Sequence, residues 1–193
     1  MRGPYRIEAY AIASADGMLA ASDGLMPDSL KLEEDQKFFN ESLDRSDIVV
    51  HGRMSYEGQA NSPRRKRIIL TRKVAALSPD PANANAVFWN PVGATFEQAA
   101  EAAGVKSGTV AILGGPDVYS LFLKMGYDDF YLCRAAAVSL PGGVPVFAEQ
   151  RKGLTVEQTL EGAGLKPGPV QRLGPNVTLV EWTPKGGATL PGA

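Results

Sequence analysis

The chain has 193 residues and a net charge of −1, and 44% of its residues are hydrophobic and 21% are charged. This composition is typical of one globular domain, and a chain of this length buries roughly 70% of the surface that it exposes when unfolded. The balance of charges, with a pI of about 5.9, gives no general attraction for nucleic acid or for a membrane surface.

Cysteine and histidine are too rare in this chain to build a covalent or metal framework. Cys133 is the single cysteine, so a disulfide within the chain is excluded, which is typical of a cytoplasmic protein. His51 is the single histidine, and one His with one Cys does not make a metal site. No apolar stretch approaches the roughly 20 residues that span a bilayer. We therefore expect a cytoplasmic protein without a metal or a membrane partner.

The first half of the chain alternates short apolar strands with helices. A strand over 5–13 is followed by turn and loop signals, and an amphipathic helix is expected from Ser29, capped by Asp28 or Ser29. Later segments are a strand over 47–52, a helical start over 53–58, a strand over 67–71 and a loop over 75–86.

The second half continues the alternation and then changes character. It predicts a strand over 87–89, a helix over 95–103 closed by Gly104, a strand over 109–113, a helix from 116 to about 124 and a longer strand over 130–138. From 141 onward Gly, Pro and loop signals dominate until a final strand over 177–182.

This order of elements predicts an α/β fold with three layers. The sheet is expected to be mixed and mostly parallel, with helices on both faces. No helix is apparent between the last two strands, so an antiparallel C-terminal edge is expected. No linker divides the chain, which predicts one domain over 1–183 and a disordered tail over 184–193.

Two strand-to-helix corners carry glycines that suit a phosphate. At the first, a strand ends at Gly52 and is followed by Arg53. At the second, a buried strand meets Gly114 and Gly115, whose peptide bond can adopt an unusual conformation such as cis, and Pro116 then suits the first helical position. Free N–H groups at such helix starts favour an anion. Each corner alone is also compatible with a simple turn that binds nothing, and for the first corner alone the turn is the favoured interpretation.

A third segment supplies a hydroxyl and cations at a strand end. Thr71, Arg72 and Lys73 follow the apolar strand over 67–71 and could bind the 2′-phosphate that distinguishes NADP from NAD. Ligands of open α/β sheets bind at the carboxyl ends of strands, and all three segments are such ends.

Four segments in this order resemble the dihydrofolate reductase-like superfamily, which includes the reductase domain of riboflavin biosynthesis. The segments are 13–20, with Ser14-Ala15-Asp16-Gly17; 50–57, with Gly52-Arg53; 69–72, with Thr71-Arg72; and 112–119, with Gly114-Gly115. The resemblance runs from about 5 to 182. It implies a dihydrofolate-reductase-like fold and an NADP(H)-dependent reductase that transfers a hydride to a small heterocyclic substrate, pterin-like or pyrimidine-like, or to a carbonyl.

The resemblance also implies which residues hold the cofactor. Backbone groups around the two glycine corners would hold the pyrophosphate, Thr71 and Arg72 would lie near the 2′-phosphate, and Leu19 and Tyr119 would line the nicotinamide pocket. The implied cofactor-binding residues are Leu19, Gly52, Arg53, Met54, Ser55, Thr71, Arg72, Gly114, Gly115, Pro116, Asp117, Val118 and Tyr119.

Hydride transfer also needs a group that manages a proton at the substrate. Asp16 is the first candidate, because the loop after the first strand faces the nicotinamide pocket in this family. Glu34 and Asp35, in the first helix, are the next candidates, and the alternatives are a turn residue for Asp16 and a solvated first turn for the helix acids.

Departures from the family patterns keep two alternatives open. Met18 stands where riboflavin reductases usually carry Lys, and Leu113 stands where they carry an acid before the Gly-Gly pair. These departures count against a riboflavin-pathway reductase, which is kept as one alternative function, and they motivate the other alternative, a non-catalytic nucleotide-binding protein that kept the fold.

The remaining expectations concern His51, Cys133, a basic run and two strands. His51 is interpreted as a packing or hydrogen-bonding residue, and Cys133 as a small buried hydrophobe. The basic run over 64–67 is expected to be a solvated loop that adds attraction for phosphates, without nucleic acid as a partner. The strands over 130–138 and 177–182 could form an exposed β face, which makes a homodimer a further hypothesis.

Overall fold

The computed structural model describes residues 4–54 and 61–186. Its strands are β1 (Tyr5–Ser14), β2 (Met18–Ala20), β3 (Ile48–Gly52), β4 (Arg67–Leu70), β5 (Leu77–Asp80), β6 (Asn83–Trp89), β7 (Gly108–Ile112), β8 (Asp129–Ala135), β9 (Val144–Pro145), β10 (Leu165–Pro167), β11 (Gln171–Arg172) and β12 (Val177–Pro184). Its α-helices are α1 (Glu33–Arg45), α2 (Phe96–Ala102), α3 (Pro116–Met125) and α4 (Val156–Gly162), and short 3-10 turns span Asp28–Leu30, Ser62–Arg64 and Ala148–Lys152.

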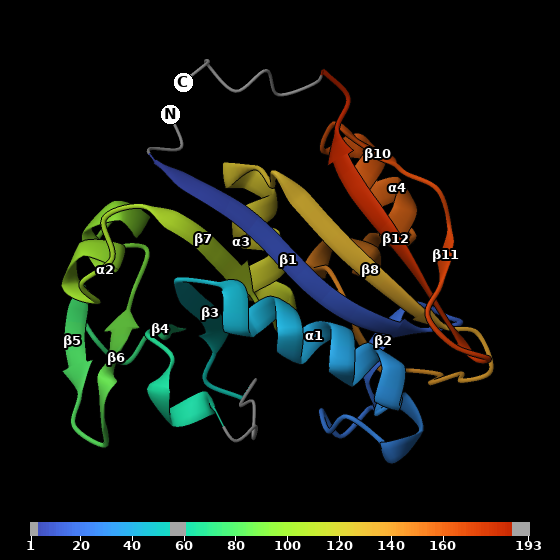
Figure 1. Ribbon diagram of the computed structural model, residues 1–193, viewed down its shortest axis with the longest axis horizontal. Coiled ribbons are helices and arrows are strands. Elements are labelled where there is room, and N and C mark those ends of the chain that lie inside the picture. Colours follow the sequence, from blue (N-terminus) through green and yellow to red (C-terminus); the bar gives the residue numbers. More distant parts are fainter. Residues whose placement is uncertain (1–3, 55–60, 187–193) are drawn as a thin grey trace.

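One large mixed sheet organises the described residues, in the order β10-β12-β8-β1-β7-β3-β4-β6-β5, as Figure 1 shows. The central strands from β8 to β6 run parallel to their neighbours. The sheet becomes antiparallel where β12 pairs with β8 and where β5 pairs with β6. The predicted fold class, including the antiparallel C-terminal edge, is confirmed.

Helices cover both faces of the sheet, as the sequence predicted. On one face α1 packs through Leu43 against Val49 and Ala111 of the central strands. The other face carries α2, α3 and α4, whose buried side chains join the largest cluster of the core, with Phe96, Phe122 and Leu160 among its members. In Figure 1, α1 crosses in front of the sheet and α3 lies behind it.

The first helix begins later than predicted. Residues 28–30 form a 3-10 turn, and α1 begins only at Glu33 with Leu32 as its N-cap. Asp28 does not cap the helix, because its carboxylate pairs with the Lys31 ammonium at 2.7 Å. The turn directs Leu30 into the core, where it is fully buried. Ser29 lies inside the turn and therefore does not start the helix.

The predicted loop over 75–86 is largely a β-hairpin, which the prolines concealed. β5 contains Pro79 and pairs antiparallel with β6, whose first residue is Asn83. Proline has no N–H to donate to a neighbouring strand. It is tolerated in β5 because β5 is an edge strand, with one side facing solvent and not a neighbouring strand. At the turn, the Ala82 N–H donates to the Asp80 carboxylate at 2.9 Å.

A helix that was not predicted lies between β8 and β12. α4 begins with a capping box in which the Thr155 hydroxyl accepts from the Gln158 N–H and the Gln158 side chain accepts from the Thr155 N–H. The antiparallel edge is therefore present although a helix does intervene. At the C-terminus β12 runs to Pro184, and the Lys185 N–H donates to the Gly164 carbonyl at 2.9 Å. The remainder of the predicted tail, 187–193, lies outside the described residues.

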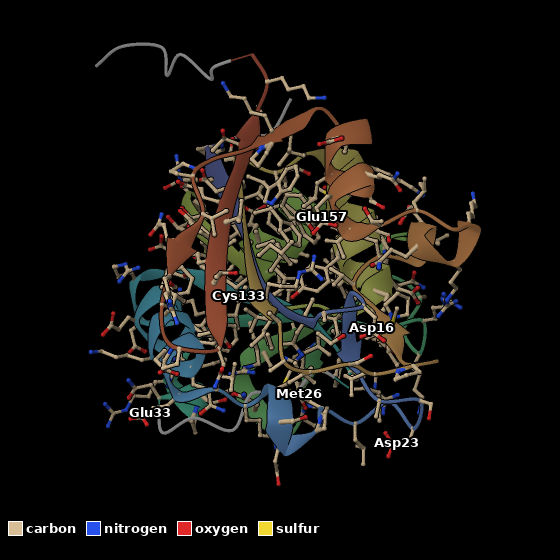
Figure 2. All side chains as sticks on the ribbon, turned by 90° about the vertical axis from the view of Figure 1, so that its right-hand side faces the viewer. Asp16, Asp23, Met26, Glu33, Cys133 and Glu157 are labelled. Atoms are coloured by element: carbon tan, nitrogen blue, oxygen red, sulfur yellow. The ribbon has the colours of Figure 1, made fainter. Side chains whose placement is uncertain are left out.

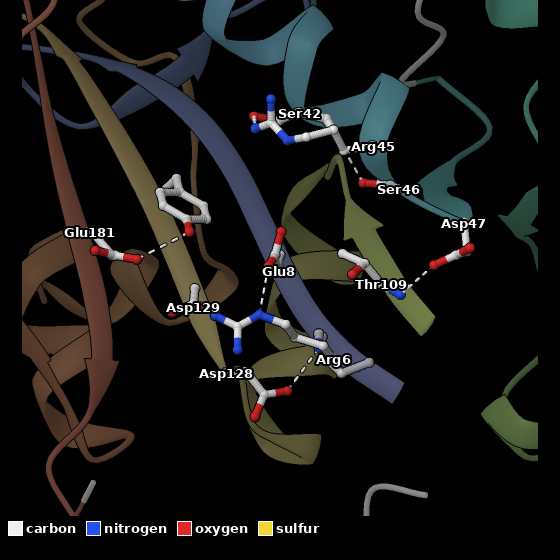
Figure 3. Close-up of polar contacts among 12 residues, drawn as sticks. Arg6, Glu8, Ser42, Arg45, Ser46, Asp47, Thr109, Asp128, Asp129 and Glu181 are labelled. Carbon is white, nitrogen blue, oxygen red and sulfur yellow. Dashed lines mark hydrogen bonds and ion pairs between the residues drawn. The ribbon is translucent and has the colours of Figure 1, made fainter. Parts of the chain in front are cut away.

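Carboxylates gather where β1, β8 and β12 lie side by side (Figure 3). Arg6 pairs with Glu8 at 2.7 Å and also with Asp129, and the Tyr131 hydroxyl donates to Glu181 at 3.1 Å. Burial raises the pKa of Asp129 to about 6 against the attraction of Arg6, and the carboxylates of Glu8 and Glu181 add to the rise.

This raised pKa predicts a pH-dependent stability. The folded chain holds the Asp129 proton more tightly than the unfolded chain does, so stability present in acid is lost as the pH rises through about 6. Between about pH 4 and pH 7 we expect the free energy of unfolding to fall by on the order of 1 kcal/mol more in the wild type than in Asp129→Asn. Urea denaturation at several pH values measures this, with the exposed Glu101→Gln as control, and equal slopes for Asp129→Asn and wild type would contradict it.

Candidate functional site

Three strand ends that are distant in sequence meet at one edge of the sheet. β3, β4 and β7 are parallel, and β3 lies between the other two. The Gly52 N–H donates to the Gly114 carbonyl at 2.8 Å, which joins the first glycine corner to the second. Arg72, after β4, places its guanidinium 3.6 Å from the Asp117 carboxylate at the start of α3. The three predicted segments therefore converge.

A cleft of about 1500 Å³ opens along this edge. Most of the residues predicted to hold a cofactor line it, and they come from β2, from both glycine corners and from the end of β4. These residues are Leu19, Gly52, Arg53, Met54, Thr71, Arg72, Gly115, Pro116, Asp117, Val118 and Tyr119. Gly114 does not line the cleft, and Ser55 lies outside the described residues, as does most of the helical start predicted over 53–58.

The second glycine corner has an unusual backbone that only glycine accepts easily. The peptide bond between Gly114 and Gly115 is cis, and Gly114 has a φ of +92°. Gly115 is the N-cap of α3 and provides no side-chain cap. Pro116 has no N–H group, and the Val118 N–H donates to the Gly115 carbonyl at 3.0 Å. Among the first three residues of α3, the Asp117 N–H is therefore the donor available to a ligand.

Tyr119 lies beneath this corner instead of projecting into the cleft. Its side chain is buried, and its hydroxyl donates to the Tyr10 carbonyl at 2.5 Å. An added Cβ on Gly114 would lie 2.5 Å from Cε2 of the Tyr119 ring. The ring thus forms part of the cleft floor and supports the corner, whereas the resemblance implies a tyrosine beside the nicotinamide.

The cations of this region divide into exposed and buried groups. Arg53 is exposed at the cleft, and the Arg72 side chain is 90% exposed there. The basic run over 64–67 is not a solvated loop throughout, because Arg65 pairs with Asp44 at 2.5 Å and Arg67 is buried. The Arg67 guanidinium lies 3.1 Å from Nε2 of His51 and donates to the Ser62 carbonyl at 2.6 Å. Arg65 and Arg67 therefore make contacts within the fold and do not line the cleft.

Asp16 occupies a turn and does not line the cleft. Its carboxylate accepts from the Ser14 hydroxyl at 2.6 Å, from the Leu140 N–H at 2.9 Å and from the Ser139 hydroxyl at 3.2 Å. The Ser14 hydrogen bond, with the Leu140 N–H, lowers the pKa of Asp16. A carboxylate held in this way is a poor proton donor, and the turn interpretation fits it.

The loop that contains Asp16 is braced by the C-terminal part of the chain. Arg134 donates to the Ser14 carbonyl at 2.8 Å and pairs with Glu157 of α4. Gln150 donates to the Gly17 carbonyl at 3.2 Å, and β2 pairs with β9. Figure 2 shows Glu157 and Asp16 on the same side of the molecule. These contacts hold the loop and the following strand β2 in place, and Leu19 of β2 lines the cleft.

Of the helix acids, only Asp35 lines the cleft. Glu34 lies against Gly174, where an added Cβ would meet its Oε1 at 2.4 Å, and Glu33 is exposed (Figure 2). Asp35 contacts the thiol of Cys133, which lies on β8 in the interior. Burial raises the pKa of Asp35, although the hydrogen bond from Cys133 opposes the rise. Burial and the neighbouring Asp35 raise the pKa of the Cys133 thiol.

An aromatic wall beside Asp35 was not predicted. Tyr10 and Tyr131 are register partners on β1 and β8, and their rings stack with centroids 5.1 Å apart. Phe38 of α1 packs against the Tyr131 ring at 5.6 Å. All three residues, with Phe39, line the cleft. The aromatic residues are visible in the sequence, but their pairing depends on the register of two strands that are more than a hundred residues apart.

Asn40 adds an unsatisfied acceptor to the same region. It lies on α1 and lines the cleft, and its Oδ1 is buried without a hydrogen-bond partner among the described residues. A buried acceptor of this kind costs free energy unless a ligand or water donates to it.

The described residues contain neither a candidate metal site nor a candidate membrane-spanning helix. Within 4–54 and 61–186, no three His, Cys, Asp or Glu side chains are grouped so that they could hold a metal ion. In the same ranges, none of the helices has the length and apolar character needed to cross a bilayer.

Comparison with known proteins gives one family and many similar structures. The family model described as "Dihydrofolate reductase" matches residues 9–143, which is more than half of the chain. A comparison with curated proteins found no match. A putative riboflavin biosynthesis protein from Shewanella sp. PV-4 has a TM-score of 0.63 and 18% identity, covering 92% of this chain and 98% of that one.

Two further structures extend this likeness. A diaminohydroxyphosphoribosylaminopyrimidine deaminase/5-amino-6-(5-phosphoribosylamino)uracil reductase from Thermotoga maritima has a TM-score of 0.67 and 14% identity over 94% of this chain, which spans 57% of that protein. A dihydrofolate reductase from Enterococcus faecalis, complexed with NADP(H), has a TM-score of 0.58 and 17% identity, covering 92% of this chain and 95% of that one. At these identities the structures establish the shared fold.

Proposed function

The chain belongs to the dihydrofolate reductase family, and from this premise we propose that it is an NADPH-dependent reductase that transfers a hydride to a small heterocyclic or carbonyl substrate. The observation that carries the proposal is the convergence of three strand ends on one cleft that also contains Asp35. A cleft with a phosphate-binding corner and a half-buried acid suits both parts of such a reaction.

The residues present fit a phosphorylated dinucleotide. The start of α3 offers the Asp117 N–H and the positive end of the helix dipole to a pyrophosphate. Arg53 and Arg72 are exposed at the same end of the cleft, where guanidinium groups can bind phosphate oxygens. Leu19 and the braced loop would lie against the nicotinamide end. When bound, the cofactor supplies the hydride.

The protein's own chemical contribution is a proton at the substrate. A C=N or C=O group gains negative charge at its nitrogen or oxygen as it is reduced, and a nearby carboxyl can protonate that atom. Asp35 is the acid placed for this role, because it lines the cleft and burial raises its pKa. In this proposal Asp16 and Glu34 take no part in proton transfer.

The walls around Asp35 favour a flat ring as the substrate. The stacked Tyr10 and Tyr131 rings and Phe38 give a broad aromatic surface. Asn40 offers an acceptor to a polar N–H or O–H group of the substrate. A pterin-like or pyrimidine-like heterocycle presents both a flat face and N–H donors, and it is therefore the favoured substrate class.

Cofactor binding and turnover test this function separately. NADPH and NADH are titrated against the protein while the nicotinamide fluorescence is followed. Dihydropterins, pyrimidine intermediates and small carbonyls are then screened for NADPH oxidation. The proposal predicts NADPH binding and turnover of at least one of these substrates. No NADPH binding at high micromolar concentration would refute it, and binding without turnover would favour the non-catalytic alternative.

Arg72→Ala is expected to weaken NADPH binding by about 10- to 100-fold and NADH binding by less than about threefold. The reason is that hydrogen bonds to charged groups contribute about 1.5–3 kcal/mol, and only NADPH carries the 2′-phosphate. Fluorescence titration gives both dissociation constants. Lys106→Ala removes an exposed positive charge away from the cleft and should change neither constant. Equal losses for the two cofactors in Arg72→Ala would exclude the 2′-phosphate role.

A further inference from the structure

Asp117 brings a negative charge to the end of the cleft that would receive phosphates. It is the second residue of α3, after Pro116, and its carboxylate lies 3.6 Å from the Arg72 guanidinium. Both residues line the cleft, and their side chains are 71% and 90% exposed. The pair joins the end of β4 to the start of α3, across the region where the strand ends converge.

This ion pair contributes little to the fold. Exposed pairs of this kind are worth about 0–1 kcal/mol, because water screens them. The Asp117 carboxylate also gains from the positive end of the α3 dipole, but any acid in the first turn would gain the same. Neither the ion pair nor the dipole interaction explains why this acid lines the cleft and pairs with Arg72, which also lines the cleft.

The carboxylate and an incoming phosphate compete for the same partners. A guanidinium that binds a phosphate must first leave the carboxylate, and the phosphate would then lie within a few ångströms of a like charge. Both effects reduce the affinity for the phosphate that Arg72 binds. Arg72 attracts that phosphate, and Asp117 opposes the attraction.

We propose that Asp117 is a specificity-determining residue that lowers the preference for a 2′-phosphorylated cofactor by occupying Arg72. The inference rests on the dinucleotide site proposed above and deepens it. The backbone at the start of α3 attracts the pyrophosphate, while the Asp117 side chain limits how tightly the adenosine end is held. The balance between Arg72 and Asp117 then sets both the choice between NADPH and NADH and the release of NADP⁺ after the reaction.

Asp117→Asn tests the proposal because it removes the charge with almost no change of shape. The dissociation constant of NADPH is expected to decrease by about 3- to 10-fold, and that of NADH to change by less than about twofold. The gain for NADPH should fade as salt is added, since salt screens exposed charges. Fluorescence titration of the full chain measures both constants, and the rise in Tm at saturating NADPH gives a second readout that does not depend on turnover.

The control is Glu97→Gln, which removes an acid from the first turn of α2, away from the cleft. It removes the same dipole interaction and should leave both cofactor affinities unchanged. The double variant Arg72→Ala with Asp117→Asn isolates the mechanism, since without Arg72 most of the gain for NADPH should be lost.

The outcomes separate this inference from the function on which it rests. If the wild type binds neither NADPH nor NADH, the proposed function and this inference both fail. If the wild type binds NADPH but Asp117→Asn leaves its affinity unchanged, weakens it, or raises NADH affinity equally, the inference alone is overturned. A gain that persists fully in the Arg72→Ala background would also overturn it.

Discussion

Asp35→Asn is expected to lower kcat/KM for substrate reduction by about 100- to 10,000-fold, the usual contribution of a positioned acid. The amide keeps the shape of the carboxyl but cannot deliver its proton. Because Asp35 lies near Cys133 of β8 and Arg72 follows β4, with three strands between β8 and β4, the dissociation constant of NADPH should stay within about twofold of the wild-type value. Steady-state kinetics with a substrate from the screen, together with fluorescence titration, measures the two quantities.

The pH dependence provides an independent readout of the same variant. Burial raises the pKa of Asp35, so the folded chain holds this proton more tightly than the unfolded chain does. The associated stability is present in acid and is lost as the pH rises through the raised pKa. Asp35→Asn should therefore match the wild type in acid and have the higher Tm at neutral pH. Wild-type turnover should also fall as the pH rises and the carboxyl loses its proton.

Glu33→Gln is the matched control for Asp35→Asn, because Glu33 lies on the same helix but is exposed. It should change neither turnover nor the pH dependence of the Tm. Near-normal turnover in Asp35→Asn would exclude Asp35 as the proton source, and Asp16→Asn and Glu34→Gln would then be tested for that role.

Gly114→Ala is expected to lower the free energy of unfolding by about 3 kcal/mol or more and to abolish detectable cofactor binding. The new Cβ would lie 2.5 Å from Tyr119 Cε2 and 2.9 Å from its Cζ, and the backbone φ of +92° is itself unfavourable for alanine. The Tyr119 ring is buried and its hydroxyl is held by the Tyr10 carbonyl, so we expect the glycine corner to shift instead. Urea denaturation and NADPH titration measure the two effects.

Gly153→Ala separates the backbone effect from the clash. Gly153 has a φ of +87°, close to that of Gly114, but an added Cβ would have nothing within 4 Å. This control should cost only about 1 kcal/mol and leave NADPH binding unchanged. If both variants were destabilised equally, the contact between the corner and Tyr119 would have no energetic importance.

The central fold could be predicted from the sequence because its signals are local. Buried apolar runs that end at glycine mark β3 and β7, and the carboxyl ends of parallel strands meet by geometry alone. The errors arose where local signals conflict. Pro79 favours a loop, although it lies in an edge strand. Asp28 and Ser29 are typical helix-capping residues, although they lie in a 3-10 turn before α1. The capping box of Thr155 and Gln158 lies in a segment where Gly and Pro favour a loop.

The site was less predictable because it depends on contacts between distant residues. The resemblance placed the cofactor residues near one another, since each lies within a motif. The choice among Asp16, Glu34 and Asp35 could not be made from spacing, because it depends on which way each carboxyl points. Asp35 is distinguished by its contact with Cys133, and no local pattern relates a residue on α1 to one on β8.

The bracing of the loop after β1 has a consequence for how this chain can vary. Arg134, Gln150 and Glu157 hold that loop, and the latter two lie beyond the segment that the family model matches. The position of this loop, and of Leu19 beside the cleft, thus depends on residues more than a hundred positions downstream. A relative with a different C-terminal segment would need another set of supports for this loop, even with every residue around the glycine corners unaltered.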